Sequence, residues 1–265
     1  MVRLIALVVT LIISGLSFGI EGYLVERYVI SESPYGSNAS VEKEYVTKKG
    51  IIRESEKGDY KSTTIMVPSK GGIKTITIDH KTKTYTEMEM PSGMILMGLM
   101  MMAIECPQGQ ANPNACRIKK VDEMVKLTGK SEKVGKWKAR EAIMEANSMM
   151  GKSITKLWLV KDPLLIKAQE MTLSFYKKLA YNDPKIAGGM GKNMVEDVFK
   201  SLKKFLKKYG ASVKEESFGP MQSKTERVIK SVKKVNVPES MFKPPKGYTK
   251  RSIMGHMMMP PGGSR

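Results

Sequence analysis

The feature that most limits how this chain can fold is a series of short alternating segments in its first third, each ended by a tight turn. In residues 22–31 the apolar side chains fall on two faces, with Tyr23, Val25 and Val29 on one and Leu24, Tyr28 and Ile30 on the other. Residues 41–55 turn at Gly50, and residues 62–90 turn at Gly71–Gly72 and again within 79–83. Alternation with a period of two, broken by glycine turns, is typical of antiparallel strands. This part of the chain therefore predicts an antiparallel meander.

Further strands are predicted after residue 120. They cover residues 123–134, 136–148, 153–163, 211–219 and 224–237. The run AREAIMEA within the second of these has helical propensity of its own, and its strand prediction rests on the turns on either side.

Two helices are predicted between these strands. The first begins at Asp162, which can cap it, with Pro163 in its first turn. Its apolar face carries Leu164, Ala168, Met171, Phe175 and Leu179. The second runs from Asn193, with Glu196 placed to complete a capping box, and ends at Gly210. Strands and helices in this arrangement predict an α+β fold.

The stretch ANSMMGKS, residues 146–153, contains the Gly-Lys-Ser of a phosphate-binding loop. Such a loop needs glycine at its first position and a helix directly after it. Here Ala146 takes the first position, and the following ITKLWLV alternates as a strand does. We therefore interpret residues 149–152 as a hairpin turn.

The first residues have the pattern of a secretory signal. Arg3 precedes an uncharged apolar run from Leu4 to Leu16, and small residues follow at Ser17 and Gly19. The run is shorter than the ~20 apolar residues of a transmembrane anchor. We expect residues 1–19 to be removed near Gly19, and the mature protein to be periplasmic.

Two cysteines, Cys106 and Cys116, flank a loop rich in proline, glycine and asparagine. In an oxidising compartment such a pair favours one disulfide. A metal pair and a redox pair are the alternatives, and both normally use closer spacing.

Residues 92–104 form the most apolar stretch after the signal. Ser92 can cap a short helix that carries no charge until Glu105. A helix of this composition must be buried on most sides, and it is too short to cross a bilayer. We expect it to pack into a hydrophobic concavity as a plug or lid.

The chain is strongly basic, with 45 Lys and Arg against 26 Asp and Glu and a formal net charge of +19. In an exported protein this favours an anionic membrane surface or envelope polymer over nucleic acid as partner. The other interpretation is a solvated lysine-rich surface. For the helix after Asn193, we expect the apolar side to pack on the core and the lysines to face solvent. The alternative is a basic helix that lies on an anionic membrane.

Several stretches together resemble a bacterial family of exported domains related to the periplasmic lipoprotein carrier, the LolA-like half-barrels. They are TITIDHKTKTYTEM, KSEKVGKWKAREAIMEA, SITKLWLVKD and VNVPESMFKPPKGYTK, in addition to the signal. The resemblance implies a curved antiparallel sheet with helices covering its concave face, and a cavity for lipid or acyl chains. It supplies no catalytic residue. The expected organisation is a signal (1–19), a single half-barrel domain (20–253) and a flexible tail (254–265).

Three classes of function compete: an enzyme, a metal-handling protein and a binding module. The two histidines, His80 in a turn and His256 in the tail, do not fit a catalytic motif, so we expect no enzyme and no cofactor. A copper site is an alternative, because thioether sulfur suits Cu(I); its ligands would be Met254, His256, Met257, Met258 and Met259.

The main hypothesis is a binding module for an apolar ligand such as a lipid, an acyl chain, a lipoprotein or a partner's hydrophobic segment. Its candidate cavity and lid residues are Met88, Met90, Ile95, Leu96, Leu99, Met102, Trp137 and Trp158. The other interpretation is that these residues form a closed core. The sequence does not specify an oligomeric state.

Overall fold

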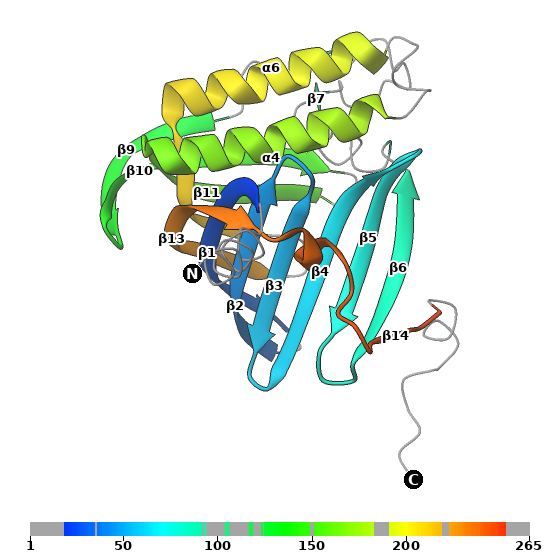
Figure 1. Ribbon diagram of the computed structural model, residues 1–265. Helices are drawn as coiled ribbons and strands as arrows, with labels where there is room; N and C mark the ends of the chain where they lie inside the picture. The colour runs from blue at the N-terminus through cyan, green and yellow to red at the C-terminus, as the bar shows by residue number, and fades with distance from the viewer. Residues whose placement is uncertain are drawn as a thin grey trace, which may run out of the picture.

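The computed structural model in Figure 1 describes residues 19–34, 36–91, 93, 104–105, 117–118, 123, 125–148, 151–182, 191–218 and 223–252. Their strands are β1 (Ile20–Ser33), β2 (Gly36–Thr47), β3 (Ile51–Lys57), β4 (Tyr60–Ser69), β5 (Gly72–Asp79), β6 (Thr84–Pro91), β7 (Ile104–Glu105), β8 (Arg117–Ile118), β9 (Val125–Val134), β10 (Trp137–Ser148), β11 (Gly151–Val160), β12 (Ala211–Phe218), β13 (Lys224–Val237) and β14 (Thr249–Lys250). The helices are α4 (Pro163–Tyr181), α6 (Gly191–Tyr209) and the 3₁₀ helix η2 (Glu239–Phe242).

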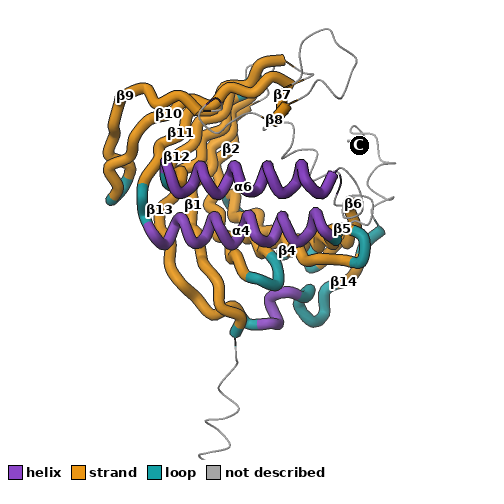
Figure 2. Tube along the Cα trace, turned by 90° about the horizontal axis from the view of Figure 1, so that it is seen from above, coloured by secondary structure: helices purple, strands orange, loops and turns teal. Residues whose placement is uncertain are grey.

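Twelve of these strands form one open sheet in the order β14-β6-β5-β4-β3-β2-β1-β13-β12-β11-β10-β9. All neighbours are antiparallel except β14 and β6, which are parallel. Figures 1 and 2 show the sheet curving around the two long helices, which run side by side. The predicted meander in the first third and the α+β half-barrel are therefore confirmed.

The sheet consists of two parts that join over a short seam. Strands β12 and β13 pair only from Lys214–Val228 to Phe218–Lys224. Beyond that seam β13 continues along β1 as far as Val237, while the start of β12 follows β11. The N-terminal end of α4 packs with both parts, because Leu165 and Ala168 share a core cluster with Val25 of β1 and Val213 of β12.

Helix α4 begins as predicted. The Asp162 carboxylate accepts hydrogen bonds from the backbone N–H groups of Leu164 and Leu165 at 2.9 and 3.1 Å. Leu165, Ala168, Phe175 and Leu179 are buried. Leu164, which we expected on the apolar face, is 39% exposed, so that prediction is wrong.

Helix α6 begins at Gly191, two residues before the predicted start. Glu196 does not form the predicted capping box, because its carboxylate accepts from Lys177 Nζ at 2.8 Å and from the Tyr181 hydroxyl at 2.5 Å. The apolar side of α6 is buried, at Val195, Val198, Phe199, Leu206 and Tyr209. The expected core packing of this helix is confirmed.

Gly210 ends α6. Its φ of +95° is one that side chains other than glycine rarely adopt. A Cβ at this position would lie 2.1 Å from the Val160 carbonyl oxygen. The close approach lets β12 start directly beside the end of β11.

The ANSMMGKS stretch lies in a β-hairpin. Strands β10 and β11 pair antiparallel, with Ser148 opposite Gly151, and residues 151–153 belong to a strand. A phosphate-binding loop would need a helix there, so the hairpin interpretation holds.

The expected helix over residues 92–104 lies almost entirely outside the described residues. Ile104, placed at its end, is in strand β7 and pairs with Ile118 of β8. Among the described residues, no helix combines the length and apolar character needed to cross a membrane.

The segment after β13 covers the second face of strands β3–β5. Phe242 of η2 packs with Ile52, Ile65, Ile76 and Ile78 in one cluster, against which Tyr248 also packs. Strand β14 then adds to the edge of β6.

Candidate ligand-binding site

The inner face, which is the face of strands β1–β6 that packs against α4, is apolar at one end of the strands and polar at the other. At the apolar end, Val46, Ile51 and Ile73 cluster with Phe175 and Leu179 of α4. The strand register then places on the same face Arg27, Glu42, Glu44, Arg53, Ser55, Thr64, Thr77 and Thr86. The open part of the half-barrel is therefore lined by charges and hydroxyl groups.

Two arginines and two glutamates form a cluster on this polar part. Arg53 Nη2 and Nε lie 2.6 and 3.1 Å from Glu44 Oε2, and Arg27 Nη2 lies 2.5 Å from Glu44 Oε1. Glu42 is further away, with its Oε2 3.6 Å from Arg27 Nε and 3.9 Å from Arg53 Nε. Glu44 thus lies between two guanidinium groups, and the four charges balance.

The electrostatics of the cluster keep it ionised. Burial disfavours the charged form of Glu44, but Arg27 and Arg53 outweigh burial and hold its pKa below the ordinary value. Burial also acts against Arg53, and its pair with Glu44 raises its pKa despite that. On α4, burial and the charge of Glu44 raise the pKa of Tyr176. The charges therefore persist inside the fold at neutral pH.

Some donors on the inner face are unused. Arg27 Nε and Nη2 and Thr75 Oγ1 are buried without a hydrogen-bond partner among the described residues. Both Arg27 nitrogens nevertheless have an ion-pair partner, since Nη2 lies 2.5 Å from Glu44 Oε1 and Nε lies 3.6 Å from Glu42 Oε2. Buried polar groups normally have partners, so the Thr75 hydroxyl is a candidate group for a hydrogen bond to a ligand.

Of the residues proposed for the cavity, Met88 and Met90 lie on the inner face. They follow one another on the same side of β6, opposite Thr75 and Ile73 of β5. Met90 packs against the apolar cluster under α4, while Met88 is 43% exposed. Met88 is therefore an apolar side chain at the accessible end of this face.

Trp137 and Trp158 lie elsewhere. Both are buried in the cluster around the start of α4, at 8% and 4% exposure. Trp137 Nε1 donates to Asp162 Oδ2 at 2.8 Å, and Lys214 Nζ lies 4.3 Å from the centre of the Trp158 ring. The two tryptophans therefore belong to a buried core cluster around the start of α4, away from Met88 and Met90, and their role as cavity walls stays a prediction.

The remaining predicted residues lie outside the described part of the chain. They are Ile95, Leu96, Leu99 and Met102 of the lid, the cysteines Cys106 and Cys116, and Met254, His256, Met257, Met258 and Met259 of the tail. Within the described residues, no group of three or more His, Cys, Asp or Glu side chains is arranged to hold a metal ion.

A hydroxyl–imidazole contact occurs at His80, in the predicted turn. His80 Nε2 lies 2.8 Å from Thr63 Oγ1, and His80 Nδ1 lies 3.0 Å from the Tyr248 hydroxyl. The spacing suits a nucleophile and a base, but Thr63 is only 7% exposed, on the face that the C-terminal segment covers. The contact fastens that segment to the sheet.

The charged cluster was not predicted from the sequence, although the position of Arg27 indicated a buried ion pair. Arg27 shares a strand face with Tyr23, Val25 and Val29. A charge on an otherwise apolar strand face indicates a buried partner. Which residues would pair with it depends on strand register, which the alternation does not specify.

No protein-family model matches this chain. A protein of uncharacterised function from Aquifex aeolicus (strain VF5) is 24% identical over 236 residues, which cover 88% of this chain and 83% of the relative.

Among solved structures, a conserved protein from Thermus thermophilus matches 89% of this chain and 91% of its own, with a TM-score of 0.42 and 8% identity. A candidate outer membrane lipoprotein-sorting domain from Vibrio parahaemolyticus matches 84% and 89%, with a TM-score of 0.29 and 9% identity. PNGF-II matches 89% of this chain with a TM-score of 0.34 and 10% identity, and this chain spans only 32% of its length. With TM-scores below 0.5 and identities of 8–10%, these similarities carry no argument about family or ligands.

Proposed function

We propose that this protein is an exported, periplasmic, non-catalytic binding module whose inner face takes an amphipathic ligand such as a lipid or an acylated segment. The observation that carries the proposal is the exposure of Met88 on the inner face, next to the apolar cluster that includes Met90. An acyl chain would contact Met88 and the apolar end near Met90. A polar headgroup would contact the Thr75 hydroxyl, which lies opposite Met88 on β5.

The chain's uncharged segment supports the same proposal. Residues 92–104 follow Pro91, the last residue of β6, and lead to Ile104 of β7. The segment therefore starts at the end of the strand that carries Met88. We propose that it covers the ligand as a lid.

Native mass spectrometry of protein purified from the periplasm tests the proposal first, because a bound lipid would add its mass to the folded protein. A titration with a fluorescent acyl-chain probe then compares wild type with Met88→Asp. A charge at Met88 should weaken probe binding roughly tenfold, because burying a methionine side chain contributes about 1.5–3 kcal/mol.

Leu127→Asp is the matched control. Leu127 is 46% exposed, on β9, the opposite edge strand of the sheet. This variant should bind the probe as wild type does. Equal weakening by both substitutions, or no probe binding by the wild type, would remove the proposal.

A further inference from the structure

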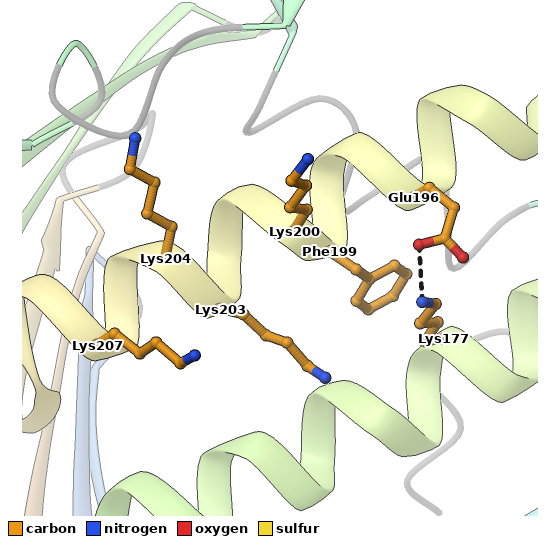
Figure 3. Close-up of a pocket in the computed structure, with 7 residues that line it drawn as sticks. All are labelled: Lys177, Glu196, Phe199, Lys200, Lys203, Lys204 and Lys207. Carbon is orange, nitrogen blue, oxygen red and sulfur yellow. Dashed lines mark hydrogen bonds and ion pairs between the residues drawn. The ribbon is translucent and has the colours of Figure 1, made fainter.

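The outer surfaces of α4 and α6 form a second concave feature. It is a groove of about 450 Å³, the lysine groove, shown in Figure 3 and lined by Lys177, Glu196, Phe199, Lys200, Lys203, Lys204 and Lys207. Lys177 comes from α4 and the other six residues from α6. Phe199 is buried beneath it, at 1% exposure.

The charges of the groove are strongly unbalanced. Its only acidic residue, Glu196, is already paired with Lys177 and Tyr181. Lys200, Lys203, Lys204 and Lys207 are exposed and have no ion-pair partner among the described residues. Within the part of the chain that the structure describes, these four positive charges are therefore uncompensated.

Their spacing makes these lysines repel one another. They are three or four residues apart along α6, so their side chains are neighbours on the helix surface. Like charges at this spacing destabilise a helix. The arrangement costs stability in the free protein, and a surface of negative charge would offset that cost.

The side chains of the lysine groove and their place on α6 favour one kind of anion over another. The groove offers lysine point charges without arginine, whose planar guanidinium binds phosphate through two hydrogen bonds. Its four unpaired lysines lie between the middle of α6 and its last turn, away from the backbone N–H groups that bind single anions at helix starts. These features favour an extended array of negative charges over one chelated phosphate.

We propose that the lysine groove docks this protein on the anionic headgroups of a phospholipid bilayer. The apolar side of α6 is buried in the core, so the helix does not insert, and the attraction is electrostatic. This proposal is independent of what the inner face binds.

Docking at the groove would bring the bilayer close to the inner face. Tyr176 of α4 interacts with Glu44 on the inner face, and the next residue, Lys177, lines the groove. Only the thickness of one helix, about 10 Å with its side chains, separates the lysine groove from the inner face.

The test is co-sedimentation with phosphatidylcholine vesicles made with and without phosphatidylglycerol. We expect the wild type to bind only the anionic vesicles, and added salt to release it. The variant Lys200→Gln/Lys203→Gln/Lys204→Gln/Lys207→Gln should bind roughly 500-fold more weakly, because each of the four lysines near an anionic surface contributes about a fivefold factor. Glutamine preserves helix propensity, so the fold should be retained, as circular dichroism would check.

The control carries the same change in total charge away from the groove. It is Lys48→Gln/Lys57→Gln/Lys70→Gln/Lys81→Gln, at four exposed lysines of the β2–β6 region. Retained binding by this control supports a local docking surface. Equal loss in both variants would show attraction by net charge alone and overturn the proposal. Equal binding to neutral vesicles, or groove-dependent binding of soluble polyphosphate without vesicle binding, would also overturn it.

Discussion

Glu44 is the residue on which the charged cluster of the inner face depends. Its side chain is 12% exposed and contacts both Arg27 and Arg53. We expect Glu44→Gln to lower the free energy of unfolding by about 3 kcal/mol, because removing one partner leaves buried charge uncompensated. Urea denaturation measures this. The control is Glu56→Gln, which breaks an exposed pair with Lys61 and should leave the urea midpoint unchanged. Equal effects of the two substitutions would contradict the role of Glu44 as the centre of the cluster.

The same carboxylate predicts a dependence on acid. The pKa of Glu44 is lower in the folded protein than the ordinary value of 4.5. Its contribution to stability is therefore fully present above pH 4.5 and is lost as the pH falls through the folded-state pKa. Thermal unfolding between neutral and acidic pH should show a shallower loss of stability in Glu44→Gln than in wild type. Parallel profiles would be the contrary result.

The residues of the site were only partly predictable. Met88 and Met90 could be placed on one strand face, because both lie in one alternating run. Trp137 and Trp158 lie in a buried cluster, and the sequence left both interpretations open, because a large aromatic side chain suits a cavity wall and a closed core equally well. The start of α4 fills the space beside them, and a strand pattern carries no information about that packing.

At the scale of elements, Asp162 joins α4 to the sheet. It accepts from two backbone N–H groups of α4 and from Trp137 Nε1 of β10. We expect Asp162→Ala to cost about 2 kcal/mol, through loss of the cap and of a partner for a buried N–H group. The emission of Trp137 should change as well. Asp162→Asn keeps a capping side chain and should lose less; an unchanged stability in Asp162→Ala would show that the cap is dispensable.

The C-terminal segment divides into a part that packs and a part predicted to be dispensable. Phe242 is 5% exposed in the cluster on the second face of the sheet. Phe242→Ala should lower stability by about 3–5 kcal/mol. Deletion of residues 255–265 should leave the melting temperature almost unchanged, because its proline- and glycine-rich sequence does not build packed structure. If the tail binds Cu(I), this deletion should also abolish that binding.

Elements with strong local signals were predicted well, and those set by distant contacts were not. AREAIMEA forms the strand β10 in spite of its helical propensity, because β9 and β11 pair with it on both sides. The start of α6 was missed because Glu196, expected to cap its own helix, pairs instead with two residues of α4. Local sequence does not reveal such a partner.

At the scale of the whole molecule, the two-stranded sheet of β7 and β8 supports the prediction of a disulfide between the cysteines. Glu105 pairs with Arg117 in antiparallel register, and these residues are the chain neighbours of Cys106 and Cys116. Directly opposite residues in such a ladder are about 5 Å apart, which suits a disulfide. We expect intact-mass analysis of exported protein to show no thiol that reacts with an alkylating agent until a reductant is added. Two reactive thiols in the untreated protein would contradict the bond.

The pairing of β1 with β13 could not be predicted from the sequence. Alternation identifies strands and glycine turns identify hairpins, so the meander β1–β6 followed from local pattern. The partner on the other side of β1 comes from the far end of the chain, with Ile20 opposite Val237. No periodicity encodes that choice.

This pairing has a consequence for when the protein can fold. Because β1 lies between β2 and β13, the sheet stays incomplete until the last long strand has left the ribosome. Strand pairings between distant parts of a chain also form slowly. The complete sheet therefore cannot form before residues 224–237 have been synthesised. If the protein is exported as we propose, the late synthesis of β13 would keep the sheet incomplete for most of the time that the chain is being made.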